Sequence, residues 1–421
     1  MKMRFQKPRR EQGSVLIVTL ILGTLLLLGL STYLMLLVSQ KNLGTRSQTW
    51  NASLALCEAG VEEALAQVNS SALNFTNTGL AKTDFSDNGW GSSGSVYGPV
   101  ARSFPGGTYA VIVPTNGPTP TIYATGYATV PIVGDQISRV VKVTTTRQGL
   151  FNVGIGAIGN IDFNGNGIIT DSYNSQLASL STAAQYDPAK TSTNGSIASK
   201  EGLIDLGNHT IKGDEYLGPN AANSNNGTVT GTTYYDYNVQ FPDVILPPGA
   251  NGWSIAPATS GTYVFTTSGN YTINEDRPVT VYPGVTVNLN VTSSDFTATA
   301  IKILGGITNA GTARFFLNGP SSVSIAGNTA VNPTRPINLV FYGLPSLTSI
   351  TFSGTTDFQG VIYAPEANIA LNGGGNAINL SGSVIVKNIT DNGHYLIHYD
   401  ESLADYGPSR GYVANSWLEL F

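Results

Sequence analysis

Residues 162–167 read DFNGNG, so carboxylate and amide oxygens alternate as they do in the first half of a calcium-binding loop. The candidate ligands are Asp162, Asn164, Asn166 and Asp171. The twelfth position of such a loop, where a bidentate glutamate is needed, is Tyr173. Calcium is therefore the one cofactor that the sequence suggests, and a β-turn stabilised by Asn and Gly is the favoured alternative.

Two of the three histidines, His394 and His398, are four residues apart, with Asp400 and Glu401 close behind them. Histidines four apart on a helix can share a metal ion. Residues 394–400 read HYLIHYD, which alternates like a strand, and a period of two also places both histidines on one face. The pair is a candidate metal site, and a structural pair of surface or interface histidines is the favoured interpretation.

Three tyrosines cluster in the segment TYYDYN, at Tyr234, Tyr235 and Tyr237. Exposed tyrosines bind sugars and proteins, because each ring offers an apolar face and a polar tip. Tyrosines are also ordinary strand residues. The cluster is a candidate binding surface, with a purely structural role as the favoured alternative.

The rest of the chain offers little for catalysis. It has three histidines and one cysteine, and it contains no nucleophile elbow, phosphate loop, zinc signature or kinase motif set. We therefore expect no catalytic residues and no enzymatic activity. The net charge is −5 although the first thirteen residues are basic, so nucleic acid is not an expected partner.

An uncharged apolar run from Val15 to Val38 must position everything that follows it. As a helix it would span about 36 Å, enough to cross a bilayer. Five basic residues precede it: Lys2, Arg4, Lys7, Arg9 and Arg10. The positive-inside rule then places the N-terminus in the cytoplasm and exports the bulk of the chain, which makes it a single-pass membrane protein.

The helix should continue well beyond the apolar run. From Trp50 to Val68, apolar residues recur every three or four positions. We expect one helix over residues 14–68, with a membrane-spanning half at 14–40 and an amphipathic half at 41–68. The single cysteine, Cys57, falls on the apolar face of the second half and is expected to be buried there.

These N-terminal residues resemble type IV pilins. The basic segment 1–13 ends in KPRREQG and is followed by SVLIVTL, which looks like a prepilin-peptidase site cut between Gly13 and Ser14. The stretch ALCEAGVEEALAQV, at 55–68, resembles the A-E-A-G segment of the PilX N-terminal family of minor pilins. The resemblance covers about the first seventy residues.

Position five after the expected cut departs from the pattern of major pilins. Those proteins carry a glutamate there that pairs with the N-terminal amine of a neighbouring subunit, and this chain has Val18. A buried unpaired charge is costly, so the family's ion pair guides subunit addition. The resemblance therefore implies a minor subunit, at the tip or at initiation, and the alternative is a plain single-span anchor.

Two further domains are expected. Residues 69–149 should form a pilin-like head, with loops over 73–105 and an antiparallel meander from strands at 108–114, 121–131 and 136–147 that packs on the amphipathic helix. Residues 150–421 repeat a short pattern of alternating apolar residues ending in Gly, which favours a β-solenoid resembling a parallel β-helix. A β-sandwich is the second choice. Segments 161–175, 358–375 and 398–403 resemble a domain often found after PilX-type N-termini.

The predicted fold class is thus mainly β with one long N-terminal helix. The resemblance implies a minor subunit of a type IV pilus or related filament that displays its β domain at the cell surface, for adhesion. Its partners would be the inner membrane before assembly, other pilin subunits, the assembly machinery and prepilin peptidase, with surface glycans or host and cell surfaces as targets. The alternative is a membrane-anchored carbohydrate-active or carbohydrate-binding β-helix protein.

Overall fold

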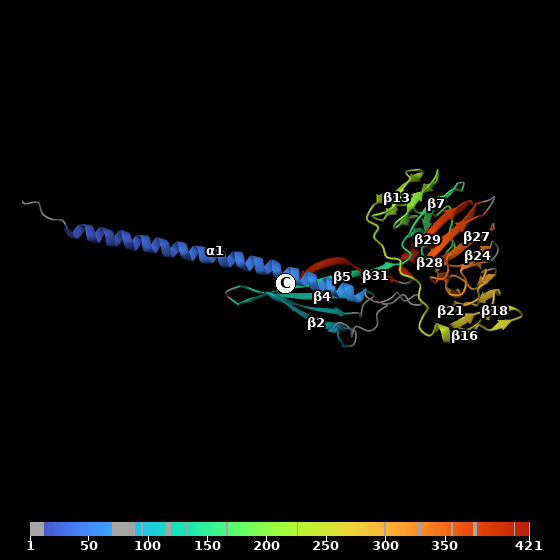
Figure 1. The fold of residues 1–421 in the computed structure, drawn as a ribbon, viewed down its shortest axis with the longest axis horizontal. Coiled ribbons are helices and arrows are strands. Elements are labelled where there is room, and N and C mark those ends of the chain that lie inside the picture. Colours follow the sequence, from blue (N-terminus) through green and yellow to red (C-terminus); the bar gives the residue numbers. More distant parts are fainter. Residues whose placement is uncertain are drawn as a thin grey trace, which may run out of the picture. The chain divides into compact units, whose positions relative to one another are not determined.

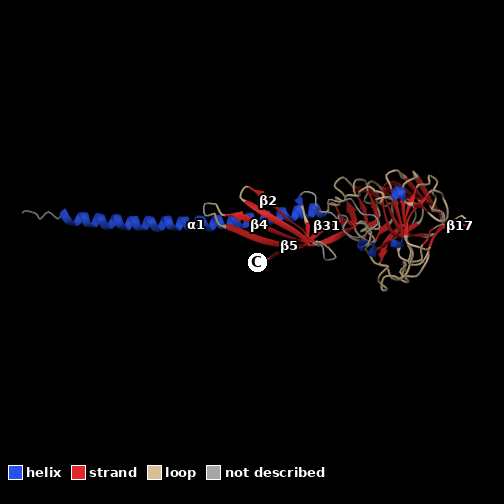
Figure 2. Cartoon of the chain, turned by 90° about the horizontal axis from the view of Figure 1, so that it is seen from below, coloured by secondary structure: helices blue, strands red, loops and turns tan. Residues whose placement is uncertain are grey.

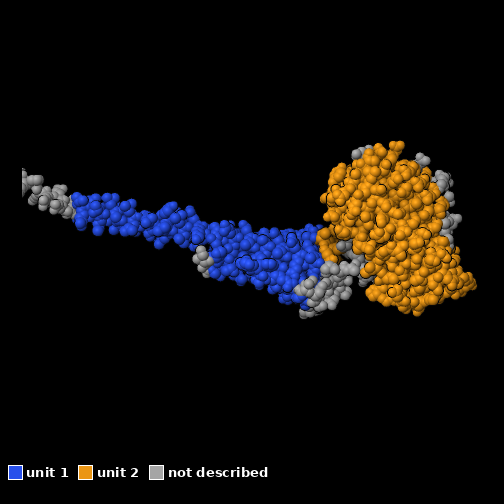
Figure 3. Space-filling view, viewed as in Figure 1, with its two compact units in different colours: residues 1–67, 84–145, 414–421 blue, residues 68–83, 146–413 orange. Residues whose placement is uncertain are grey.

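The structure is a computed structural model, and it divides the chain into two compact units (Figures 1 and 3). Unit 1 contains Met1–Gln67, Asp84–Thr145 and Ala414–Phe421, and unit 2 contains Val68–Thr83 and Thr146–Val413. The structure describes residues 12–69, 89–93, 96–114, 119–131, 134–165, 167–224, 226–298, 300–326, 330–354, 357–373, 377–407 and 409–420.

Unit 1 combines one long helix with an antiparallel sheet. Helix α1 runs over Gln12–Val68, which confirms the predicted helix, and its second half lies on the sheet (Figure 1). The strand order is β1-β2-β3-β4-β5-β31. The strands are β1 (Ser92–Ser93), β2 (Val96–Phe104), β3 (Gly107–Pro114), β4 (Thr121–Thr129), β5 (Gln136–Gly149) and β31 (Ser409–Leu420).

Small residues let α1 lie directly on this sheet. A Cβ atom on Gly126 of β4 would come within 2.1 Å of the Ser53 carbonyl oxygen. The Cys57 thiol donates a hydrogen bond to the Arg139 carbonyl (3.2 Å) and accepts one from the Gly126 amide (3.1 Å). The CEAG stretch therefore places Cys57 and Gly60 against the sheet, and burial raises the pKa of the Cys57 thiol.

Two predictions for unit 1 need correction. The segment expected to be loops contains β2, whose alternation is interrupted at Gly98–Pro99, where its register with β3 shifts between Tyr97 and Val100. The C-terminal boundary also differs from 150–421, because β31 joins the head sheet beside β5. The Arg139 guanidinium pairs with the Glu419 carboxylate there. The large β domain is therefore inserted into the head, rather than appended to it.

Unit 2 is a solenoid of parallel strands, as the sequence predicted, rather than a sandwich (Figure 2). The first series of strands is β6 (Ile155–Ala157), β7 (Ile161–Phe163), β8 (Ile169–Tyr173), β9 (Ile197–Ser199), β10 (Leu203–Asp205), β11 (Thr210–Ile211), β12 (Glu215–Leu217), β13 (Ala222–Asn223), β14 (Thr228–Val229) and β15 (Thr233–Tyr234). Each strand pairs in parallel with its counterpart one coil away, as β7 with β10 and β10 with β13.

A second series of strands follows in the chain. Its strands are β16 (Ser254–Ile255), β17 (Ala258–Thr259), β18 (Thr262–Phe265), β19 (Gly269–Ile273), β20 (Val279–Val281), β21 (Thr286–Val291), β22 (Ile301–Ile303), β23 (Thr312–Leu317), β24 (Ser322–Ala326), β25 (Ala330–Val331), β26 (Leu339–Gly343), β27 (Ser349–Ser353), β28 (Phe358–Leu371), β29 (Ile378–Asp391) and β30 (Tyr395–Asp400). Short 3-10 helices lie at η2 (Ala250–Gly252), η3 (Pro336–Asn338) and η4 (Glu401–Asp405).

The chain enters this stack of coils in the middle, not at an end. The first series winds outward to β15, and the second series winds back until its last coil, β29 and β30, stacks on the first. Val384 pairs with Ile155, and Ile397 pairs with Thr170. We call the pairings of β29 with β6 and β7, and of β30 with β8, the seam. The two ends of the inserted domain are therefore brought together by the fold.

The longest parallel ladder, which includes β21, β23, β26 and β28, is buried on both of its faces. Its inward side chains, among them Leu289, Phe315 and Phe341, belong to the main core inside the coils. Its outward side chains, among them Phe316 and Tyr342, form a second core. Residues 235–253, which we call the strap, cover that second core with Tyr237, Phe241 and Val244. This double burial explains the runs of consecutive apolar residues in β26, β28 and β29.

Candidate functional site

The apolar half of α1 is exposed along its length. Every large hydrophobic side chain from Val15 to Val38 is exposed, with Leu26 at 71% and Val18 at 53% exposure. The helix is long and apolar enough to cross a membrane. Surface of this kind is costly in water, so it requires lipid or other apolar helices around it.

The expected processing site lies at the start of this helix. Gly13 and Ser14 belong to the first turn of α1 as the structure defines it. The basic residues of the leader lie outside the described residues. The peptide between Gly13 and Ser14 therefore lies within the helix, and its cleavage stays a prediction.

The second half of α1 is fixed to the sheet by an ionic network. Arg102 on β2 donates hydrogen bonds to both carboxylate oxygens of Glu63, the shortest at 2.7 Å. The Tyr109 hydroxyl donates to the same carboxylate at 2.5 Å. Burial opposes ionisation, but these hydrogen bonds dominate and lower the pKa of Glu63. Burial and the adjacent Glu63 raise the pKa of Tyr109 to about 12.

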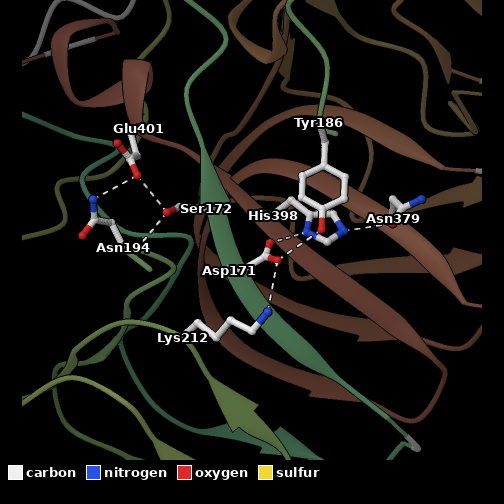
Figure 4. Close-up of polar contacts among 8 residues, drawn as sticks. All are labelled: Asp171, Ser172, Tyr186, Asn194, Lys212, Asn379, His398 and Glu401. Atoms are coloured by element: carbon white, nitrogen blue, oxygen red, sulfur yellow. Dashed lines mark hydrogen bonds and ion pairs between the residues drawn. The ribbon is translucent and has the colours of Figure 1, made fainter. Parts of the chain in front are cut away.

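The densest polar cluster of unit 2 lies across the seam (Figure 4). His398 on β30 and Asp171 on β8 are direct partners in the parallel register. The His398 Nδ1 atom lies 2.5 Å from Asp171 Oδ1, and its Nε2 atom lies 2.9 Å from Asn379 Oδ1. Both His398 and Asp171 are at most 2% exposed. The cluster therefore joins strands that are more than two hundred residues apart in the sequence.

A long loop between β8 and β9 covers this cluster. The Tyr186 ring stacks on the His398 ring, with centroids 3.4 Å apart, and its hydroxyl donates to Asp171 Oδ2 at 3.1 Å (Figure 4). Burial and the Asp171 carboxylate raise the pKa of Tyr186 well above its ordinary value. Lys212 Nζ lies 3.8 Å from the same carboxylate. At the base of the loop, Ser172 donates to Glu401 Oε1 at 2.8 Å.

A histidine paired with an aspartate is the usual arrangement of a general base. Here each ring nitrogen faces an oxygen atom of the protein, and Tyr186 covers one face of the imidazole. A substrate could reach His398 only if the loop moved aside. In the arrangement observed, the cluster holds the loop and the two series of coils together.

Of the predicted calcium ligands that the structure describes, Asp162 and Asn164 lie together and Asp171 has other partners. Asp162 Oδ2 accepts a hydrogen bond from the Asn164 side-chain amide at 2.9 Å. Asp171 lies in the seam cluster with His398. Asn166 lies outside the described residues. Among the described residues, no group of three His, Cys, Asp or Glu side chains could hold a metal ion.

The two candidate metal histidines have separate surroundings. His394 precedes β30 and lies beside the turn at Gly167, where a Cβ atom would come within 3.0 Å of its Nε2 atom. His398 lies within β30 and contacts Asp171 and Asn379. The strand begins only at Tyr395, so the alternation that placed both histidines on one face does not extend to His394.

The tyrosine cluster divides into exposed and buried members. Tyr234 is 42% exposed and Tyr235 is 68% exposed, whereas Tyr237 is 7% exposed and belongs to the second core. Tyr234 stacks on Tyr216, with centroids 5.2 Å apart and planes 11° from parallel. Two of the three tyrosines are therefore available at the surface, where the first series of coils ends at β15.

The structure buries three acids, of which the sequence pattern had indicated only Asp400, beside the histidine pair. Asp391, Asp400 and Glu215 have no exposed surface. Burial raises the pKa of Asp391 to about 7, although the Gly393 amide donates a hydrogen bond to its Oδ1 atom at 2.9 Å and opposes this rise. Burial also raises the pKa of Asp400. The sequence could have indicated such an acid by its position, because it stands where the strand pattern calls for an inward-facing apolar side chain. Asp391, for example, pairs with Leu371 and Phe163 on the adjacent coils.

Residues 251–406 match a family described as a domain of unknown function (DUF7305), which covers the second series of coils. No curated protein matches the chain. Among solved structures, the chain is similar to the competence-associated pilin ComZ from Thermus thermophilus, with 13% sequence identity and a TM-score of 0.32. The similarity covers 88% of this chain and 97% of that chain. A TM-score of that size does not establish a common fold.

Proposed function

We propose that this protein is a minor subunit of a type IV pilus or related filament, which it enters through the first half of α1. The observation that carries the proposal is the contrast between the two halves of one helix. The second half is packed on a sheet by Cys57, Gly126 and the Glu63 network, and the first half is uncovered apolar surface. A helix that is fixed at one end and uncovered at the other is suited to insertion among other helices.

The chemistry of the first half supports membrane residence followed by helix packing. No charged side chain interrupts the segment from Val15 to Val38, so lipid can surround it before assembly. The basic leader would stay in the cytoplasm under the positive-inside rule, with the rest exported. Prepilin peptidase would cut between Gly13 and Ser14. Other pilin subunits and the assembly machinery would then replace lipid as partners of the helix.

The side chain at Val18 distinguishes a minor from a major subunit in this proposal. An apolar side chain at this position cannot form the intramembrane ion pair that guides addition of major subunits. The chain would therefore be added rarely, at the tip or at initiation. Its inserted solenoid would be displayed at the cell surface for adhesion, and the proposal gives it no catalytic activity.

Dependence on prepilin peptidase tests the proposal. The native protein should start at Ser14 in cells with the peptidase and at Met1 in cells without it, as measured by intact mass. Gly13→Val should block the cut, because the bulky side chain obstructs the peptide at the site. Gly44→Val is the matched control, since open space surrounds a Cβ atom there. A wild-type chain that still begins at Met1 in cells with the peptidase would contradict filament entry.

The second candidate is a membrane-anchored carbohydrate-active or carbohydrate-binding β-helix protein. The exposed Tyr234 and Tyr235 favour it. An active enzyme would degrade a polysaccharide when the full chain is supplied in detergent, and one carboxylate substitution would abolish that degradation. A chain that binds without turnover, and does not enter filaments, would be a simple anchored adhesin.

A further inference from the structure

On the outward face of the longest ladder, one side chain from each coil forms a column. This column ends in two stacked tyrosines, and the strap does not cover the outer one. Along this column, Phe316 pairs with Tyr342, and Tyr342 pairs with Tyr363. After three small or aliphatic positions, the last pair is Tyr216 with Tyr234. The strap covers the side chains of this column from Phe316 to Tyr216. At Tyr216 the cover is the Tyr237 ring, whose centroid lies 5.7 Å from that of the Tyr216 ring. Tyr234 lies beyond that cover.

Tyr234 therefore has one occupied face and one free face. Its occupied face stacks on Tyr216, which is the neighbour one coil below. Its strand, β15, pairs with β12 alone in the described part of the chain, so no further coil lies above it. The free face is the position that the next ring of the column would occupy. Tyr235 follows directly, at 68% exposure.

One carboxylate contacts this stack, and a second lies nearby in the sequence. Asp214 Oδ2 accepts a hydrogen bond from the Tyr216 hydroxyl at 3.3 Å, and Asp214 Oδ1 accepts from the Thr232 amide at 2.8 Å. Asp236, two residues after Tyr234, is exposed. Burial and the charges of Asp214 and Asp236 raise the pKa of Tyr216 to about 12. The site thus combines an apolar ring face with hydrogen-bond acceptors and negative charge.

We propose that Tyr234 and Tyr235, with Asp214 and Asp236, bind a neutral sugar whose apolar ring face continues the aromatic column. A pyranose has one face of C–H groups that can stack on tyrosine, and its hydroxyl groups can donate to carboxylates. Negative charge at the site disfavours acidic polysaccharides. A peptide strand would gain little here, because β15 spans only Thr233–Tyr234 and offers few backbone hydrogen bonds.

This inference deepens the adhesive part of the proposed function, but it can fail separately from it. Sugar binding is measured on the purified full chain in detergent, whereas filament entry is measured by cleavage and assembly in cells. A chain that binds sugar and never enters a filament would support the site alone. A chain that enters filaments and binds no sugar would leave the filament proposal intact and overturn this one.

The test is calorimetric titration of the full chain with three neutral trisaccharides: cellotriose, chitotriose and maltotriose. At least one should bind, and the trisaccharide of galacturonic acid should bind more weakly. Tyr234→Ala should weaken binding about five- to tenfold, the loss expected for one aromatic stacking contact. Tyr234→Phe should keep most of the affinity, because it keeps the ring.

A matched control separates the site from general surface effects. Tyr282 is 43% exposed, almost the same as Tyr234, and it lies on a turn after β20 in the second series of coils. Tyr282→Ala should leave the affinity unchanged. Circular dichroism of each variant checks that the fold is kept. The proposal is overturned if no neutral trisaccharide binds, if the galacturonic acid trisaccharide binds as tightly, or if Tyr234→Ala and Tyr282→Ala have equal affinities.

Discussion

Replacing the buried carboxyl of Asp391 by an amide should make unit 2 more resistant to alkaline pH. Asp391 faces the interior between Leu371 and Phe163 of adjacent coils, and its Oδ2 atom has no hydrogen-bond partner among the described residues. Burial therefore raises its pKa from 3.8 to about 7. Asp391→Asn preserves the shape and the oxygen that accepts from the Gly393 amide.

The direction of this pH effect on the free energy of unfolding follows from proton binding. Between the two pKa values the folded chain holds a proton that the unfolded chain has released, so the free energy of unfolding falls as the pH rises. Between about pH 5 and about pH 8, a carboxyl with pKa values of 3.8 unfolded and about 7 folded loses about 2.5 kcal/mol relative to an amide that does not titrate. Any fixed cost of the buried amide N–H is the same at both pH values and cancels.

Urea unfolding of the full chain in detergent, followed by circular dichroism in the strand band, measures this difference. Wild type and Asp391→Asn are compared at both pH values, with the exposed Asp295→Asn as control. The advantage of Asp391→Asn over wild type should grow by about 2.5 kcal/mol from the lower to the higher pH. An advantage that stays constant with pH, or that shrinks, would refute the assignment of a neutral buried acid at this position.

Three other changes should act on stability. Gly126→Val places a methyl-bearing Cβ against a carbonyl of α1, and it should lower the thermal midpoint of the head by the equivalent of at least about 1–3 kcal/mol; an unchanged midpoint would argue against close helix–sheet contact. His398→Ala leaves the Asp171 carboxylate buried without its imidazole, and urea unfolding should show that the free energy of unfolding falls by about 3–5 kcal/mol. A fall of less than about 1 kcal/mol would mean that the cluster does not hold the seam together. Deleting Ser409–Leu420 removes the strand beside β5, and hydrogen exchange should show faster exchange of the β5 amides, whereas unchanged exchange would contradict the pairing.

Local patterns predicted the elements of this fold well. The periodicity from Trp50 to Val68 predicted a helix that the structure contains, and the alternating segments around β3, β4 and β5 are strands. The repeated apolar pairs ending in Gly predicted short parallel strands in coils. In each case neighbouring residues determine the pattern, so the sequence alone displays it.

Long-range order could not be predicted in the same way. Nothing local reveals that the chain enters the solenoid in its middle, because the seam between Val384 and Ile155 looks like any other pair of coils. The return of β31 to the head is equally invisible, since a strand does not specify its partner. The seam cluster depends on both facts, because His398 and Asp171 meet only across that seam.

The candidate sites show the same limit. The pattern at Asp162 predicted a polar turn or a calcium loop, but calcium binding also required Asp171 to face the same way, and the fold turns it toward His398. The tyrosine cluster was visible in the sequence. Which of its members are exposed depends on the path of the strap, because the strap carries Tyr237 into the second core, whereas Tyr234 precedes the strap and stays at the surface.

Immuno-electron microscopy of purified filaments tests the central claim most directly. Two strains are compared: one produces the wild-type chain, and the other produces a chain in which residues 15–38 are replaced by an unrelated apolar helix of equal length, with the leader and the cut site kept. Both chains should reach the membrane in equal amounts. We predict label on filaments from the first strain and none on filaments from the second, because only the native side chains fit among neighbouring helices. Equal labelling of both, or label on neither, would contradict the claim that this helix is the docking surface of a filament subunit.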